Sequence, residues 1–341
     1  MIDGVKLYVA DGTAQRFLRL SDNIRWLQNG YFPDGRPRFR GTWMNWHFLG
    51  DGERCWEIRG SFHTYAQGGS NWRDYTWKDH VQAVEAFCEA RILHPAQLIL
   101  LNIEIGVNVL PPRPTKALLR TLIHHGLVAP QRNDLGLEFK HDGYRVKVYH
   151  KAGANEDLMR FEVKATNMRE VAGLGIKTLA DTLDPEKWQG IEAFLLKKFD
   201  GILVAERVRS TGHLTEKDRE LVQDATSLEY WLGLSRSSRT RNRDKLYALC
   251  AQLPGYDLRE RLRDVIQTKA YELTPRVRPK QVLRIATFTP SVMDDRLGRN
   301  PPSSATFTPL IARSADVATR PWVWWRSRGP PKYRRAAYEQ A

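Results

Sequence analysis

Alternating apolar and polar residues mark several short runs of this sequence, and they constrain its fold more than any other feature. In LNIEIGVNV (101–109), YRVKVYHK (144–151) and MRFEVK (159–164), apolar residues occupy nearly every second position and polar residues lie between them. Side chains alternate between the two faces of a β-strand. These runs therefore predict strands of a sheet that has one apolar and one polar face.

Helical patterns lie between the predicted strands. Residues 76–91 have apolar residues at helical spacing behind a capping residue, Thr76. The order β-ββ-α-β-α-ββ-β-α predicts an α+β fold, a central and mainly antiparallel sheet with helices on one face. The other expected elements are a strand at 5–11, a hairpin of the runs 38–50 and 54–66, and helices at 114–126 and 169–183.

The distribution of charge along the 341 residues suggests three parts. The chain carries 53 Lys and Arg against 39 Asp and Glu, a formal net charge of +14, and most of the excess lies beyond residue 205. We expect an α+β domain in residues 1–205 and a helical basic segment in residues 206–274. Half of the 18 prolines lie from residue 275 onward, so we expect residues 275–341 to be a basic, irregular and largely disordered tail.

The basic composition predicts a polyanionic partner. A pI near 9.8 favours nucleic acid first and an anionic membrane surface second. No apolar run approaches the length of a membrane span, and MIDGVKLYVADG lacks the pattern of a signal peptide. Cys55, Cys88 and Cys250 are far apart and odd in number, which fits a reducing cytoplasm without a disulfide framework or a zinc site. We expect a cytoplasmic protein with no membrane contact.

The polar face of the predicted sheet gathers chemically competent residues, namely Glu57, His63, Glu104, Tyr149 and Glu162 with several Lys and Arg. Carboxylates with a histidine can hold Mg²⁺ or Mn²⁺, and such an ion polarises a phosphodiester. A tyrosine whose pKa is lowered by Lys and Arg can attack the phosphorus. The same alternation also describes a solvated sheet face with cross-strand ion pairs and no chemistry, so both interpretations stay open.

Tyr149 is the strongest candidate nucleophile, because it shares a strand face with the basic residues of its own run. Tyr144 alternates with the apolar set, so we expect it to pack in the core. Tyr65 and Tyr75 flank the QGGSN segment, where stacking or core roles are the simpler expectation.

Four motifs together resemble a known family. IRGSFHTYAQGGSNWRDYT, LNIEIGVNV, YRVKVYHKAG and LMRFEVKATNMREVAGLGIKTLADTL occur in this order. The series resembles the rolling-circle replication initiators of filamentous phages, the gene II product family, and of small bacterial plasmids. The resemblance covers roughly residues 55–185, and the shared order of short motifs carries it.

The resemblance implies particular roles. Tyr149 would be the nicking nucleophile, and Glu104 and Glu162 would be ligands of Mg²⁺ or Mn²⁺. His63 and Asn71, on the FHTYAQGGSN segment, are weaker ligand candidates.

One departure from the family pattern concerns histidine. Many rolling-circle enzymes use a His-hydrophobic-His metal motif, which this chain lacks. The adjacent pair His124–His125 falls at the end of a predicted helix, where neighbouring residues point about 100° apart and chelate poorly. We expect this pair to be structural.

Basic residues of two regions are expected to contact DNA, either a single strand or an origin hairpin. No P-loop pattern is present, so strand separation would depend on a host helicase, and a host polymerase would extend the nicked strand. The expected phosphate contacts are Arg145, Lys147, Lys151, Arg160 and Lys164 on the sheet, and Arg239, Arg241 and Arg243 in the run SRSSRTRNRDK.

The sequence thus predicts an endonuclease that nicks and rejoins one DNA strand at an origin, starting rolling-circle replication of a phage or plasmid in its bacterial host. Two alternatives stay open: a transposase or relaxase with the same chemistry, and a non-catalytic nucleic-acid-binding protein. Convergence of Glu104, Glu162 and Tyr149 would favour an enzyme. Pairing of both glutamates with Lys or Arg would favour a binding platform. The oligomeric state stays open.

Overall fold

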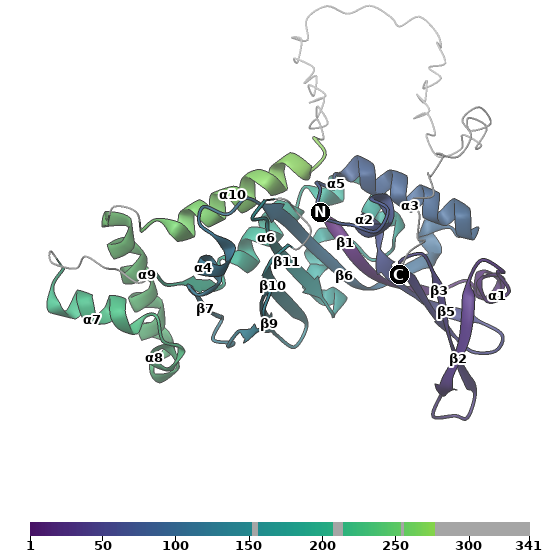
Figure 1. Ribbon diagram of the computed structural model, residues 1–341, viewed down its shortest axis with the longest axis horizontal. Coiled ribbons are helices and arrows are strands. Elements are labelled where there is room, and N and C mark those ends of the chain that lie inside the picture. The colour runs from purple at the N-terminus through teal and green to yellow at the C-terminus, as the bar shows by residue number, and fades with distance from the viewer. Residues whose placement is uncertain (152–155, 207–213, 254–255, 277–341) are drawn as a thin grey trace, which may run out of the picture. The chain divides into compact units, whose positions relative to one another are not determined.

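The computed structural model describes residues 1–151, 156–206, 214–253 and 256–276, so almost all of the expected tail lies outside the described residues. Its centre is a sheet of ten strands in the order β2-β3-β4-β5-β1-β6-β11-β10-β9-β8 (Figure 1). All neighbouring pairs are antiparallel, which confirms the predicted α+β class. A second sheet pairs β7 with β12. The strands are β1 Ile2–Val9, β2 Arg25–Tyr31, β3 Pro37–Trp43, β4 Trp46–Gly50, β5 Cys55–Ser61, β6 Leu98–Val109, β7 Leu122–His125, β8 Gln131–Arg132, β9 Gly136–Lys140, β10 Tyr144–His150, β11 Met159–Ala165 and β12 Ile202–Val204.

Strand β1 lies in the middle of the sheet, between β5 and β6. Its register with β6 shifts between Ile2 and Val5, the irregularity of a β-bulge. On its other side β6 pairs with β11, which places Lys164 opposite Glu104. Strands β1, β6 and β11 therefore carry their polar side chains side by side.

Helices α6 and α10 pack against β6 and against each other. Their buried side chains join Ile103 and Ile105 of β6 in one hydrophobic core, and Glu104, between them in sequence, faces the other way. The helices are α1 Gly12–Arg19, α2 Phe62–Ala66, α3 Trp77–Arg91, α4 Thr115–Leu119, α5 Pro185–Trp188, α6 Ile191–Phe199, α7 Glu216–Asp224, α8 Leu228–Gly233, α9 Arg236–Gln252 and α10 Leu258–Leu273.

Helix α3 begins where the sequence predicts. Asp79 Oδ2 accepts a hydrogen bond from the Thr76 backbone N–H at 2.8 Å, and Thr76 Oγ1 accepts one from the Asp79 N–H at 3.3 Å. This reciprocal pair is a capping box. On the buried side of α3, the ring of Phe87 lies 4.2 Å from that of Trp46, centroid to centroid. The helix is thereby anchored to strand β4.

Several expected elements were wrong in detail. Residues 114–126 form the short helix α4 followed by β7. The short run Leu122–His125 fits a helix or a strand equally well, and it is a strand because it pairs with β12. Residues 169–183 contain 3₁₀ turns, Met168–Leu174 and Ala180–Leu183, rather than one α-helix. The run 38–50 is itself a hairpin of β3 and β4, and α1 and β2 were not anticipated.

The helices after residue 206 belong to two hydrophobic clusters. Trp231 and Leu246, of α8 and α9, pack with Ile123 and Leu203 of the small sheet. Helix α10 instead buries Leu262 in the main core. The boundary suggested by charge near residue 205 does not coincide with the end of that core.

Candidate functional site

Three carboxylates meet on the polar face of the central strands. One oxygen each from Asp3, Glu104 and Glu162 lie within 4.8 Å of one another. They come from β1, β6 and β11, which are consecutive in the sheet. Sequence reasoning found the two glutamates but missed Asp3, because the recognisable apolar alternation of β1 begins only after the bulge that precedes Val5. We call these three residues the carboxylate cluster.

Arg160 lies at the centre of the cluster and is only 2% exposed. Its Nη2 donates to Asp3 Oδ2 at 2.6 Å and its Nε donates to Glu162 Oε2 at 2.9 Å. Burial raises the pKa of the Asp3 carboxyl, but Arg160 and the hydroxyl of Ser61 lower it more, so the net pKa falls below its ordinary value. The expected contact of Arg160 with DNA phosphates does not fit this burial, because the guanidinium is enclosed by protein acceptors.

Tyr149 also contacts the cluster. Its hydroxyl donates to Glu162 Oε2 at 3.3 Å, and Lys147 Nζ binds Glu162 Oε1 at 2.8 Å. Burial, followed by the negative charge of Glu162, raises the pKa of Tyr149. The basic neighbours of Tyr149 in the sequence predict a lowered pKa, but burial and the adjacent carboxylate outweigh them.

Glu104 is the most accessible of the three carboxylates. Lys164 Nζ binds its Oε1 at 2.5 Å, and Lys147 Nζ lies 3.6 Å from the same oxygen. The Glu104 side chain packs directly against Gly4, where a larger residue would displace it, since a Cβ at position 4 would lie 2.8 Å from Glu104 Oε2. Each carboxylate of the cluster is thus paired with a cation, which is what a non-catalytic binding platform predicts. The three carboxylates also converge with Tyr149, which is what an enzyme predicts.

His63 does not join the cluster. It is buried at the start of α2, its Nε2 lies 2.9 Å from the carbonyl oxygen of Arg73, and its ring stacks on Tyr75. Burial lowers its pKa to about 3. Asn71 comes closer, because its Nδ2 donates to Asp3 Oδ2 at 2.9 Å. Of the two weaker candidates, Asn71 is therefore the one in contact with a carboxylate of the cluster.

The alternative tyrosines lie away from the cluster. The ring of Tyr144 stacks on that of His141, with 4.4 Å between the centroids, and Lys198 Nζ lies 3.3 Å from the centroid of the Tyr144 ring. Tyr75 is fully buried, and its hydroxyl lies 3.2 Å from His80 Nδ1. Tyr65 packs against Trp46. These surroundings match the packing roles expected for them.

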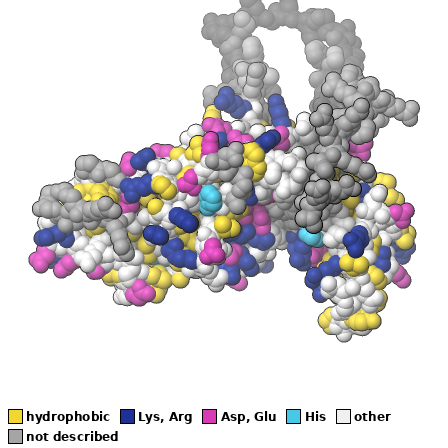
Figure 2. All heavy atoms as spheres, in the orientation of Figure 1, with side chains coloured by type: hydrophobic (Ala, Val, Ile, Leu, Met, Phe, Trp, Pro, Cys, Tyr) yellow, Lys and Arg dark blue, Asp and Glu magenta, His cyan; other side chains and the backbone are white. Residues whose placement is uncertain are grey.

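Four of the predicted phosphate-binding residues remain on the sheet face beside the cluster. Arg145 contacts Glu138 at 3.4 Å, and Lys151 Nζ lies 5.9 Å from the ring centroid of Tyr149. Lys147 and Lys164 are the partners of the cluster described above. Arg239, Arg241 and Arg243 lie on α9. Figure 2 shows Lys and Arg side chains spread over the visible face, interspersed with Asp and Glu.

The histidine pair lies on strand β7 rather than at a helix end. Neighbours on a strand point to opposite faces, and the surroundings of the two rings differ accordingly. The His124 ring lies 5.7 Å from that of Trp231, and the His125 ring 5.8 Å from that of Phe139. The pair does not chelate one ion.

The donor set of the cluster fits a hard divalent cation. Carboxylate oxygens are the ligands that Mg²⁺ and Mn²⁺ prefer, and one oxygen of each of the three carboxylates lies within 4.8 Å of the others. A cation there would displace Lys147 and Lys164 from Glu104 and leave Arg160 as the buried counter-charge. A cation at this site would therefore compete with the ammonium groups of Lys147 and Lys164.

Comparison with family models, with curated proteins and with solved structures finds no match. Among the described helices, none has both the length and the apolar character needed to cross a membrane.

Proposed function

We propose that the chain is a metal-dependent nicking and joining enzyme acting on one DNA strand, with Tyr149 as nucleophile, and that it initiates rolling-circle replication of a phage or plasmid. The observation that carries the proposal is the contact of the Tyr149 hydroxyl with Glu162, a member of a three-carboxylate cluster. Glu162 thus links a candidate nucleophile to oxygens that could hold a divalent ion, an arrangement that suits phosphodiester cleavage.

The chemistry assigns a role to each residue of the site. Tyr149 Oη attacks phosphorus, the bond to the 3′ oxygen breaks, and the products are a 5′-phosphotyrosine and a strand with a free 3′-OH. Glu162 is the acceptor toward which the tyrosine proton leaves, and water protonates the departing oxygen. Mg²⁺ or Mn²⁺ held by the cluster would supply positive charge to the phosphodiester. Reversal rejoins the strand, since the phosphotyrosine conserves the bond energy.

The raised pKa of Tyr149 is consistent with dependence on a cation. Burial raises this pKa most, and Glu162 raises it further through its negative charge. A divalent ion shared by the cluster would offset that charge. Lys151 and Arg145, on the same face, would bind the flanking phosphates. A host helicase and polymerase would act on the freed strand, and the site of action would be the bacterial cytoplasm.

A second candidate function is a nucleic-acid-binding protein without chemistry. It is favoured by one specific observation, the pairing of every carboxylate in the cluster with Arg160, Lys147 or Lys164. A relaxase is less well supported, since His63 is directed to a backbone carbonyl and not to the carboxylates.

Strand cleavage tests the proposal directly. Single-stranded and supercoiled DNA are incubated with the protein and Mn²⁺ or Mg²⁺, and a denaturing gel is examined for a covalent protein–DNA adduct. We expect an adduct with the wild type and with Tyr144→Phe, a matched control on the same strand, and none with Tyr149→Phe. Salt-sensitive DNA binding with no cleavage of either substrate, including one carrying the cognate origin, would favour the second candidate.

Metal binding is tested separately from cleavage. Titration with Mn²⁺ is followed by the thermal unfolding midpoint, because a ligand that binds only the folded state raises it. We expect the increase to be lost in Glu104→Gln and kept in Glu57→Gln. Glu57 is a suitable control, since it lies on β5, is buried and is paired with Lys6 and Arg59, but is not part of the cluster.

A further inference from the structure

A pocket of about 460 Å³ lies between the small sheet and helix α9, away from the carboxylate cluster. We call it the α9 pocket. It is lined mainly by the turn after β7, by the residues around β12 and by the N-terminal half of α9. The residues that matter here are His124, Asp200, Trp231, Arg236, Arg239 and Arg243.

Three arginines of the pocket share one face of α9. Arg236, Arg239 and Arg243 are spaced by three and four residues, which aligns them along a helix. Among the described residues, the guanidinium groups of Arg236 and Arg239 have no hydrogen-bond or ion-pair partner, whereas Arg243 contacts Asp244 at 3.2 Å. Two cations therefore face the pocket without a counter-charge.

The position of these arginines on the helix is unfavourable in itself. Ser235 caps α9 and its first turn contains no acidic residue. The N-terminus of a helix carries partial positive charge, which favours anions and disfavours cations nearby. A bound anion would relieve both the repulsion among the arginines and the repulsion by the helix dipole.

A second, independent observation comes from His124, on the opposite wall. It is 8% exposed, and its Nε2 is buried with no hydrogen-bond partner among the described residues. Its Nδ1 accepts a hydrogen bond from the Leu127 N–H at 3.3 Å. Burial, followed by the charges of Arg239 and Arg243, lowers its pKa to about 4, so the ring is neutral at pH 7. A neutral imidazole that accepts at Nδ1 carries its proton on Nε2, so the unpartnered atom is a donor.

Among the residues that the structure describes, the one carboxylate that lines the α9 pocket is already engaged. Asp200 Oδ1 accepts from Arg259 Nη2 at 2.9 Å and from Arg263 Nε at 3.3 Å. Trp231 is almost completely buried, so it offers the pocket no free ring face for stacking a base. The pocket therefore presents donors and positive charge, and it fits a compact anion rather than a nucleobase.

We propose that the α9 pocket binds a phosphate group through the arginines of α9, beside the unpartnered Nε2–H of His124. Arginine forks match the oxygens of a phosphate. The group could be a phosphodiester of a nucleic-acid strand or free phosphate. This inference is independent of the nicking chemistry, since no residue of the pocket belongs to the carboxylate cluster.

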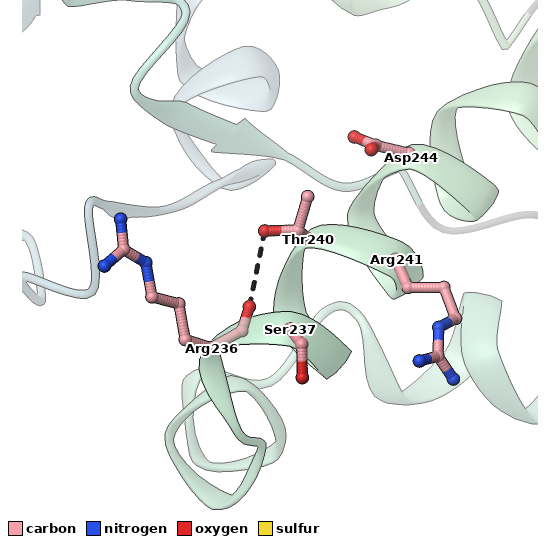
Figure 3. A pocket seen from close by; sticks show the side chains of 5 residues that line it. All are labelled: Arg236, Ser237, Thr240, Arg241 and Asp244. Atoms are coloured by element: carbon pink, nitrogen blue, oxygen red, sulfur yellow. Dashed lines mark hydrogen bonds between the residues drawn. The ribbon is translucent and has the colours of Figure 1, made fainter.

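A second hollow on α9 supplies a matched control. It measures about 670 Å³ and shares Arg236 and Thr240 with the α9 pocket, but it is otherwise lined by Ser237, Arg241 and Asp244. Figure 3 shows the side chains of Arg236 and Arg241 extending in opposite directions from the helix. The sequence groups Arg241 with Arg239 and Arg243 as phosphate contacts, but Arg241 does not line the α9 pocket. Arg241→Gln therefore removes one positive charge from the same helix without touching the proposed site.

The test compares Arg239→Gln with Arg241→Gln, both in the full chain carrying Tyr149→Phe so that cleavage cannot contribute. Inorganic phosphate is titrated at constant ionic strength while the thermal midpoint is recorded, and a labelled single-stranded oligonucleotide is titrated by fluorescence anisotropy. We expect Arg239→Gln to weaken binding of at least one probe about tenfold and Arg241→Gln to change it less than twofold. Because Arg239 is only half-buried and has no partner, its replacement should not disturb folding.

The two probes distinguish the source of the phosphate. If Arg239→Gln weakens binding of the oligonucleotide, with or without an effect on inorganic phosphate, the pocket binds a phosphodiester of a strand. If Arg239→Gln weakens binding of inorganic phosphate alone, the pocket binds a small phosphate. Equal weakening by the two substitutions would show general electrostatic attraction and overturn the proposal. Absence of binding of either probe would overturn it as well.

Discussion

Arg160 joins Asp3 across 157 positions of the sequence through a 2.6 Å hydrogen bond, and with its Nε it also holds Glu162. One buried guanidinium therefore connects β1 to β11, although β6 lies between them. Buried ion pairs offset their own desolvation only when every partner is present. The identity of residue 160 should consequently determine both the stability of the sheet and the geometry of the carboxylate cluster.

Arg160→Met is expected to lower the free energy of unfolding by about 3–5 kcal/mol, because it leaves two buried carboxylates without their shared cation. Arg145→Met removes an exposed arginine from the neighbouring strand, and we expect a change of about 1 kcal/mol or less. Urea denaturation followed by circular dichroism measures both. Equal effects of the two substitutions would contradict the central role of Arg160.

Gly106→Ala and Gly4→Ala should separate stability from metal binding. A Cβ at Gly106 would lie 2.6 Å from the carbonyl oxygen of Phe161 and 2.9 Å from Glu162 Cα. Since backbone must move, we expect a loss of about 1–3 kcal/mol. A Cβ at Gly4 meets only the side chain of Glu104, which can rotate away.

Gly4→Ala should therefore cost less stability than Gly106→Ala but reduce the thermal shift produced by Mn²⁺. Thermal unfolding with and without Mn²⁺ checks both parts. A full Mn²⁺ response in Gly4→Ala would indicate that Glu104 is not a ligand.

Acid should destabilise the protein partly through His80. This residue is fully buried between Tyr75 and Thr182, and burial lowers its pKa to about 3 from a usual value near 6.5. Between these two pH values the unfolded chain binds one more proton than the folded chain. Stability is therefore fully present above about pH 6.5 and falls as the pH drops, by up to about 1.4 kcal/mol per unit for this group.

The slope of unfolding free energy against pH identifies the contribution of His80. We expect the slope between pH 6 and 4.5 to decrease by about one proton in His80→Gln, whatever the absolute stability of the variant. Equal slopes in wild type and His80→Gln would mean that His80 is protonated in the folded protein.

Helix α10 should be required for the stability of the main core. Ile266 is fully buried there, whereas Tyr271 of the same helix is 56% exposed. We expect Ile266→Ala to cost about 2–5 kcal/mol and Tyr271→Ala less than about 1 kcal/mol. A fragment ending at residue 205 should lack a cooperative unfolding transition. A fully cooperative 1–205 fragment would show that α10 is dispensable.

Local patterns in the sequence predict much of the sheet but little of its interior electrostatics. Alternation is sufficient to place Glu104, Glu162 and Tyr149 on one face, because the period of a strand is two residues. It does not reveal that Arg160 is buried, since that depends on Asp3 arriving from a distant strand. The predicted direction of the Tyr149 pKa shift was wrong for the same reason. The direction depends on how deeply the hydroxyl is buried, and the neighbours of Tyr149 in the sequence do not determine its burial.

Two further differences between the sequence patterns and the structure have a similar cause. The run SRSSRTRNRDK and helix α10 are both rich in charge, and composition alone groups them together. The apolar positions of α10, such as Leu262, pack in the main core, and α10 contacts α6 and β6. A short segment such as Leu122–His125 becomes a strand because β12 is available to pair with it.

The central place of β1 has a consequence for how the chain folds during synthesis. Gly4 pairs with Ser61, and Ile2 pairs with Ile105, so about a hundred further residues must be synthesised after β1 before both of its edges can be paired. Pairings between distant segments are slow to form, and unpaired strand edges promote aggregation. Translation rate and chaperone supply should therefore govern how much soluble protein a cell obtains, even where the finished fold is stable.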